Sequence, residues 1–146
     1  MMTKFHEAHL QAIAADQEWS KAHDAQQSAF RFKTALDLDA FHAARSRVEA
    51  WNIVRYAGAS VTAEEIKAAY DASALFASST RRLDEAKDAL RSADELEETT
   101  EREASEAWER VREIVEASET DLTDSIANFV KGTASASDAK VKEVTQ

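Results

Sequence analysis

The sequence predicts an all-α fold: a long antiparallel helical hairpin, coiled-coil-like, with an alanine-rich seam and a third helix that makes it three-helix-bundle-like. Three observations support this prediction. The 146 residues contain no proline and only two glycines, and these two residue types disfavour helices most strongly. Small and apolar residues recur at heptad spacing along two long stretches. The first glycine, Gly58, lies between those stretches.

A single turn is expected at residues 58–62. Gly58 suits the left-handed conformation that ends many helices, because it has no Cβ atom. Thr62 is a good N-cap, and Glu65, three residues later, completes a capping box. A link this short makes the two flanking helices antiparallel neighbours.

The first helix is predicted over about 3–57 and the second over about 63–98. In the first, an alanine column with one leucine repeats every seventh residue: Ala8, Ala15, Ala22, Ala29, Leu36, Ala43, Ala50 and Ala57. In the second, two columns of mostly small or apolar residues have the same seven-residue spacing: Ala69, Phe76, Leu83 and Leu90, beside Ala72, Ser79, Ala86 and Ala93. Small side chains allow close approach of the helices, and the large aromatic residues near the stripes are expected in the core: Trp19, Phe30, Phe41, Trp51, Phe76 and Trp108.

A break is expected near Glu97 and Thr100, which interrupt the apolar seam of the second helix. Thr100 and Glu103 have the spacing of a second capping box, so a third helix is predicted over about 101–131. Whether this helix folds back on the hairpin or extends toward another chain is left open by the sequence.

The last predicted helix contains a short amphipathic segment with Leu122, Ile126, Phe129 and Val130. Gly132 is expected to end it. Residues 1–131 are therefore predicted to form a single helical domain, and residues 132–146, which are small and polar, a flexible tail.

No catalytic, metal-binding or phosphate-binding pattern is present in the sequence. His6, Glu7 and His9 lack the spacing of zinc proteases and of di-iron bundles. There is no cysteine, and two glycines are too few for a phosphate-cradling loop. We therefore expect no enzyme, no cofactor, no bound metal and no small-molecule substrate.

The net charge of −10 is unevenly distributed. Residues 1–57 carry seven basic and seven acidic side chains, whereas residues 58–146 carry eleven basic and twenty-one acidic ones. The acidic residues are densest over 94–109, and such a surface repels a phosphate backbone, so no direct nucleic-acid binding is expected.

No apolar run approaches the roughly 20 residues of a membrane span, and the N-terminus lacks the apolar core of a signal peptide. We expect no membrane contact and a cytoplasmic location at synthesis, with association with a virion as one later destination.

Six residues are candidates for contact with a protein partner. Three apolar ones fall outside the apolar stripe of the first helix, and three acidic ones lie in the dense acidic stretch: Phe32, Ile53 and Tyr56, and Glu97, Glu98 and Glu101. The leading hypothesis is a non-enzymatic structural or assembly protein, such as a virion, scaffold or secretion component. It would act through helix–helix association, with itself as partner in a homo-oligomer. The alternative is an acidic binding module or inhibitor that docks on a basic, nucleic-acid-binding surface of a partner protein.

Overall fold

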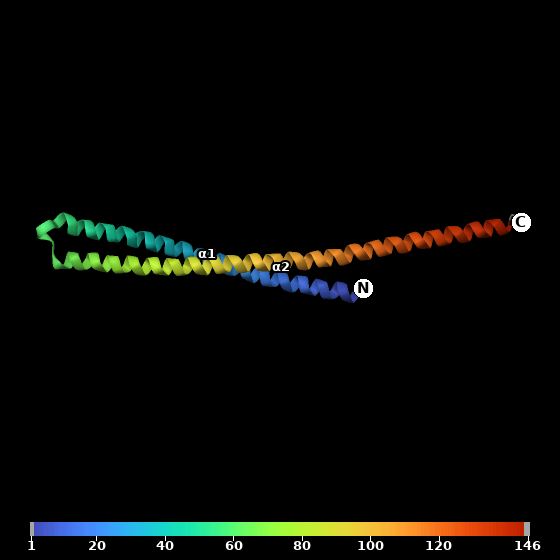
Figure 1. Cartoon of the computed structure of the whole chain (residues 1–146), viewed down its shortest axis with the longest axis horizontal. Coiled ribbons are helices and arrows are strands. Elements are labelled where there is room, and N and C mark those ends of the chain that lie inside the picture. The colour runs from blue at the N-terminus through green and yellow to red at the C-terminus, as the bar shows by residue number, and fades with distance from the viewer. Residues whose placement is uncertain (1, 145–146) are drawn as a thin grey trace. The chain divides into compact units, whose positions relative to one another are not determined.

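A computed structural model describes the backbone of residues 2–144 and the side chains of residues 3–132. The elements follow in the order α1 (Met2–Ala57), the 3₁₀ turn η1 (Gly58–Ser60) and α2 (Ala63–Val144). Figure 1 shows the two helices and their labels. No strand occurs in this described part of the chain, and the two helices pack against each other. The predicted all-α class is therefore confirmed.

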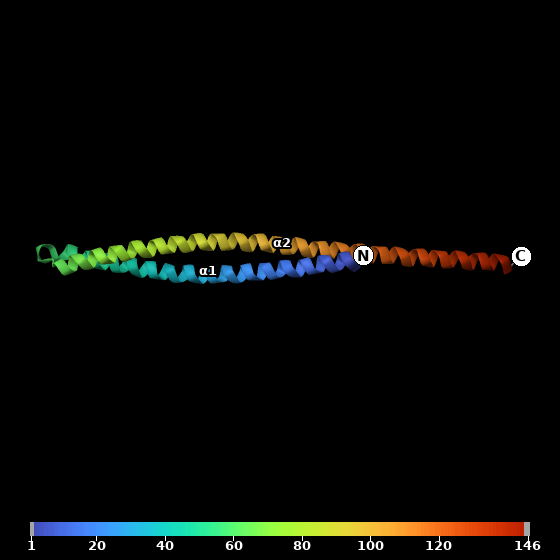
Figure 2. The same cartoon turned by 90° about the horizontal axis from the view of Figure 1, so that it is seen from below.

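The chain forms two compact units. The hairpin unit comprises Glu18–Glu101, and the terminal unit comprises the described residues of Met1–Gln17 and Arg102–Gln146. Within the hairpin unit, the part of α1 from residue 18 onward and the part of α2 up to residue 101 run side by side in Figures 1 and 2. They are joined by the short link after Ala57, as the turn prediction requires.

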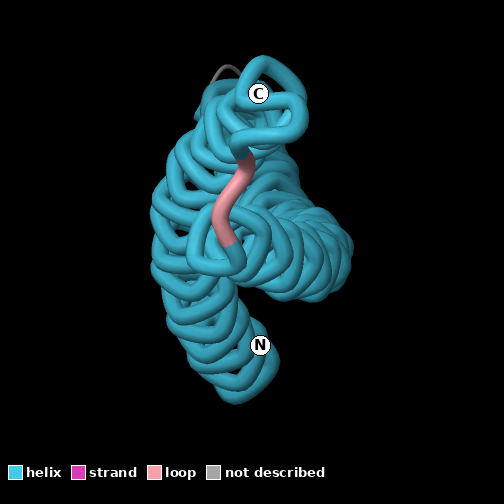
Figure 3. The backbone as a smooth tube through the Cα atoms, turned by 90° about the vertical axis from the view of Figure 1, so that its left-hand side faces the viewer, coloured by secondary structure: helices cyan, strands magenta, loops and turns pink. Residues whose placement is uncertain are grey.

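The turn has the predicted chemistry. Gly58 has a φ of +54°, and a Cβ atom there would meet no other atom within 4 Å. Glycine is therefore required by the backbone conformation and not by lack of space. Glu65 N donates to Thr62 Oγ1 at 3.1 Å, and Thr62 N donates to Glu65 Oε1 at 3.1 Å. This reciprocal pair is a capping box at the start of α2, and Figure 3 shows the loop that precedes it.

The interior of the hairpin unit is narrow and consists mainly of alanine. Its buried positions fall on the heptad columns: Ala22, Leu36 and Ala43 of α1, and Ala69, Ser79, Ala86 and Thr100 of α2. The other column positions of α1 in this unit, from Ala29 to Ala57, are half-buried. No large side chain is fully buried among the described residues. The two helices therefore meet through small side chains.

The terminal unit has a similar small core. Ala8 and Ala12 of α1 pack with Ala107 and Val111 of α2. Trp108 of α2 also contacts α1, since its Nε1 donates to Asp16 Oδ2 at 2.8 Å. The imidazole of His9 meets the Trp108 ring edge-on, with 5.8 Å between centroids. These contacts join the first turns of α1 to the middle of α2.

The expected break near residue 100 is wrong, because α2 continues without interruption from Ala63 to Val144. Thr100 does not cap a new helix. Its hydroxyl donates to the carbonyl oxygens of Leu96 at 2.8 Å and Glu97 at 3.0 Å, inside the helix. A threonine that bonds back in this way is tolerated within a helix, and no glycine or proline is nearby to stop it. In the described chain, residues 101–131 are part of α2 and do not form a separate third helix.

The expected helix end at Gly132 is also wrong. Gly132 does not adopt a positive φ, and the helix passes through it. The backbone of the predicted flexible tail is helical as far as Val144, and the last two residues of that tail lie outside the described part.

Three aromatic residues expected in the core are on the surface. Phe30 is 51% exposed, Phe41 is 62% exposed and Trp108 is 38% exposed, whereas Trp19, Trp51 and Phe76 are half-buried as part of the hairpin. For Phe30 and Phe41 the reason is that, within the hairpin unit, α2 covers only the narrow side of α1 that carries the alanine column.

Candidate protein-interaction surfaces

The three apolar contact candidates on α1 are all exposed, and Tyr56 is the most exposed of them at 84%. Ile53 and Tyr56 lie one turn apart at the end of α1, so the structure brings these two together. Phe32 precedes Ile53 by 21 residues, which is about 30 Å along a helix. Phe32 therefore belongs to a different part of the surface.

Of the acidic candidates, Glu97 is engaged within the hairpin unit. Its Oε1 lies 2.6 Å from His23 Nδ1, and its side chain is largely covered. This hydrogen bond raises the pKa of His23 above its ordinary value; desolvation opposes the shift, and the charges of Glu97 and Asp24 add to it. Glu97 thus joins α2 to α1, while Glu98 and Glu101 are exposed.

The other acidic residues of 94–109 also fall into two groups, those bonded to α1 and those exposed to solvent. Asp94 accepts a hydrogen bond from Gln26 Nε2 at 2.9 Å, so it too is used between the helices. The remaining acidic side chains of this stretch are exposed: Glu95, Glu98, Glu101, Glu103, Glu106 and Glu109. Six solvent-facing carboxylates within fifteen residues give this part of α2 a strongly negative surface.

A second apolar face on α1 was missed as a separate feature by the sequence analysis. We call it the outer stripe; it consists of Phe30, Leu38, Phe41 and Val48, which are between 51% and 62% exposed. At about 100° per residue they share one face, on the side of α1 opposite the alanine column. The signal was present in the sequence, but Phe30 and Phe41 were expected in the core of the hairpin.

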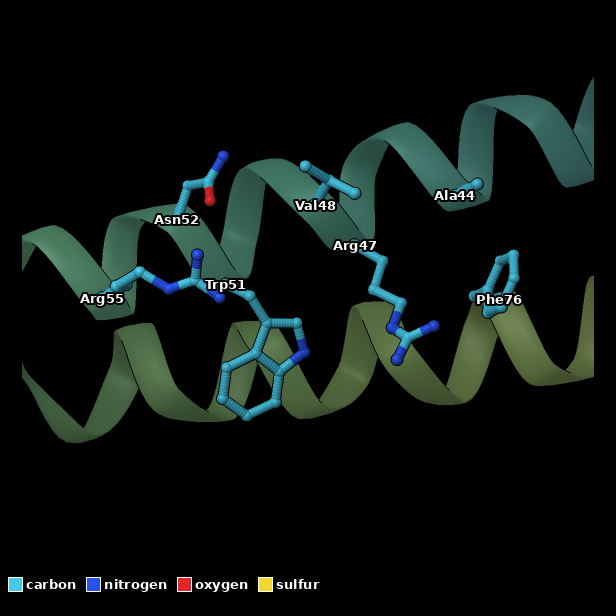
Figure 4. Close-up of a pocket in the computed structure, with 7 residues that line it drawn as sticks. All are labelled: Ala44, Arg47, Val48, Trp51, Asn52, Arg55 and Phe76. Atoms are coloured by element: carbon cyan, nitrogen blue, oxygen red, sulfur yellow. The ribbon is translucent and has the colours of Figure 1, made fainter.

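The outer stripe is bordered by basic side chains. Figure 4 shows Val48 and Asn52 pointing away from α2, while Arg47 and Trp51 point toward it. The Arg47 guanidinium lies 5.0 Å from the centroid of the Phe76 ring. Trp51 Nε1 donates to Ser73 Oγ at 2.7 Å. Arg47 and Arg55 line an open depression beside Val48, and no carboxylate lines it.

Further along the same stripe, Leu38 and Phe41 line a second open depression together with Arg31, Thr34 and Asp37. The Asp37 carboxylate is paired with Lys33 at 2.6 Å, and the Thr34 hydroxyl donates to the carbonyl oxygen of Phe30 at 2.9 Å. Both of these polar groups are therefore engaged in contacts within α1.

A third apolar surface lies on α2 within the terminal unit. We call it the α2 stripe; it consists of Leu122, Ile126, Phe129 and Val130, which are between 56% and 75% exposed. Their spacing places them on one face of the helix. The segment from Val115 to Val130 also carries four acidic and no basic residues. The α2 stripe is the amphipathic segment identified in the sequence, and it is helical as expected.

The part of the chain that the structure describes contains no group of three or more histidine or acidic side chains that could hold a metal ion. Within that part, neither α1 nor α2 has a stretch long and apolar enough to cross a membrane.

No protein-family model matches this sequence, and neither the comparison with curated proteins nor the comparison with solved structures finds a match.

Proposed function

We propose that this chain is a non-enzymatic structural or assembly protein that acts by helix–helix association with further copies of itself, as a scaffold, virion or secretion component would. The observation that carries the proposal is the placement of apolar residues. The seam of the hairpin unit is built mostly of alanine, while phenylalanine, leucine, isoleucine and valine lie exposed on α1 and α2. Large exposed apolar stripes mark protein contacts.

Two further features support the same proposal. The depressions beside the outer stripe are open, and the polar contacts between the helices are hydrogen bonds that join α1 to α2. Examples are Trp51 to Ser73 in the hairpin unit and Trp108 to Asp16 in the terminal unit. In such a protein the function resides in extended helix surfaces.

The test is the absolute mass of the purified chain, measured by light scattering on a size-exclusion column at roughly 0.01 M and 1 M salt. Association through apolar faces should give a multimer that persists at high salt, because only charge interactions are screened there. A monomer at both salt concentrations, at all accessible protein concentrations, would contradict the proposal.

A second candidate function rests on the six exposed carboxylates of α2 described above. The chain would then be an acidic binding module that docks on a basic, nucleic-acid-binding surface of a partner protein. Competition with DNA for an immobilised basic DNA-binding domain tests it. Inhibition should weaken with salt and in the variant Glu98→Gln/Glu101→Gln. Equal inhibition by wild type and this variant would argue against a role for these carboxylates.

A further inference from the structure

We infer that the α2 stripe of one copy docks on the outer stripe of α1 of a second copy. The inference rests on the proposed function and specifies which surfaces form the contact. It concerns two different surfaces, so the contact is heterologous: each copy offers one of each and can bind two neighbours. Contacts of this type form rings if the rotation closes and open chains if it does not.

The α2 stripe is shorter than the outer stripe and fits within its length. The outer stripe spans nineteen residues from Phe30 to Val48, or about 27 Å of helix. The α2 stripe spans nine residues from Leu122 to Val130, or about 12 Å, and exposed Val115 lies two turns before Leu122 on the same face. Each presents apolar residues at intervals of three, four, seven or eight, which is the spacing that lets one helix pack lengthwise on another.

The charges of the two surfaces are complementary. From Val115 to Val130, α2 carries Glu116, Glu119, Asp121 and Asp124 and no basic residue. From Phe30 to Arg55, α1 carries five basic and three acidic residues. Pairing the α2 stripe with a second α2 stripe would place four carboxylates against four, whereas pairing it with α1 places them near arginines. The charges therefore favour the heterologous contact.

The arginines nearest the outer stripe are not neutralised by ion pairs. Lys33 is paired with Asp37 at 2.6 Å and Arg45 with Glu49 at 3.1 Å. Arg31 and Arg47 have no ion pair among the described side chains; Arg47 instead rests over the Phe76 ring. These two guanidinium groups border the depressions that line the stripe, at its two ends. They could accept carboxylates of an incoming helix without breaking a pair.

The outer stripe leaves large side chains in contact with solvent, since Phe30 is 51% exposed and Phe41 is 62% exposed. The α2 stripe of a second copy has the apolar face and the opposite charge that would cover them.

The experiment uses two double variants of the full chain, both confined to exposed side chains. The first, Leu38→Gln/Phe41→Gln, removes the middle of the outer stripe, and the second, Leu122→Gln/Ile126→Gln, removes the middle of the α2 stripe. The control, Leu75→Gln/Leu96→Gln, changes two equally exposed leucines elsewhere on α2. Circular dichroism verifies that helix content is retained, and sedimentation velocity gives the mass of each protein and of the equimolar mixture of the two stripe variants.

Wild type and control should assemble in a concentration-dependent manner. Each stripe variant alone should be monomeric, because every contact then lacks one of its two surfaces. Their mixture should form a one-to-one dimer and nothing larger, since only one intact pair of surfaces remains. This complementation is the specific result of a heterologous contact.

Other outcomes overturn the inference in distinguishable ways. If the outer-stripe variant assembles like wild type while the α2 variant does not, α2 pairs with itself. If the α2 variant assembles like wild type, or the control is also monomeric, the contact lies elsewhere. In these cases the proposed assembly function stands and only the docking inference fails. If wild type is monomeric at every concentration, both fail together.

Discussion

Replacing Ala86 by leucine tests whether the seam of the hairpin unit is closely packed. Ala86 is only 4% exposed. If the helices could accommodate leucine, its additional apolar surface would stabilise the fold by about 2 kcal/mol, at about 0.8 kcal/mol for each buried CH₂ group. The small neighbours on the seam leave no room without moving the helices apart, and overpacking of this kind typically costs about 1–3 kcal/mol. The expected result is therefore a net destabilisation.

The assay is urea unfolding followed by circular dichroism, with Ala89→Leu as the matched control. Ala89 lies three residues along the same helix and is exposed, so its replacement should change the free energy of unfolding by less than about 0.5 kcal/mol. The same pair can be repeated on α1 with buried Ala22 and exposed Ala25. Equal stability of the seam and control variants would refute close packing at the seam. Higher stability of the seam variants would show that the helices are free to separate.

Three further predictions concern the turn and the contacts between the helices. Gly58→Ala should destabilise the folded chain by about 1–2 kcal/mol because the φ of Gly58 is +54°. Gly132→Ala, at an open helical position, should instead increase the helix content. Equal effects of the two substitutions in circular dichroism melts would contradict this prediction. Thr62→Ala removes the N-cap and should cost about 1 kcal/mol in urea unfolding; no loss would mean that the cap is dispensable. The pKa of His23 is raised, chiefly by its hydrogen bond to Glu97, so the pair stabilises the fold below the ordinary pKa of 6.5, and this contribution disappears as pH rises through the raised pKa. The difference in unfolding free energy between wild type and Glu97→Gln should therefore shrink from about pH 5.5 to 8. A difference that is independent of pH would refute the linkage.

The turn was fully predictable because its determinants are local. Gly58 is the one residue near that point free of Cβ strain at positive φ, and Thr62 and Glu65 form their hydrogen bonds within a single helical turn. The alanine column was predictable for a similar reason, since a strict heptad places its members on one side of a helix. Both predictions depended on spacing alone.

The break near residue 100 was mispredicted because a capping box and an internal threonine have the same sequence signature. Thr100 has the glutamate three residues later that a cap requires, yet its hydroxyl bonds back to Leu96 and Glu97. Capping competes with continued helix, and without a glycine or proline the helix continues. Local spacing could not decide this competition.

The outer stripe was not recognised because α1 carries apolar residues on more than one side. Phe30 and Phe41 lie only one and two residues from the column positions Ala29 and Ala43. A sequence of this kind fits several seams, and which one is buried depends on the helix that packs against it. Only the contacts between α1 and α2 distinguish the side that holds the hairpin together from the side that stays exposed.

This separation of sides makes folding and association independently testable. The residues that hold the helices together are mostly small and face inward, whereas the large apolar residues of the outer stripe face solvent. A substitution such as Ala86→Leu should therefore change the free energy of unfolding measured on the monomer. A substitution such as Leu38→Gln should leave that free energy within about 0.5 kcal/mol of wild type, as expected for surface positions, and change only the mass of the assembly. If substitutions on the outer stripe destabilised the monomer as much as those on the seam, these residues would be part of the folded core in solution, and the proposed contact between copies would lose its basis.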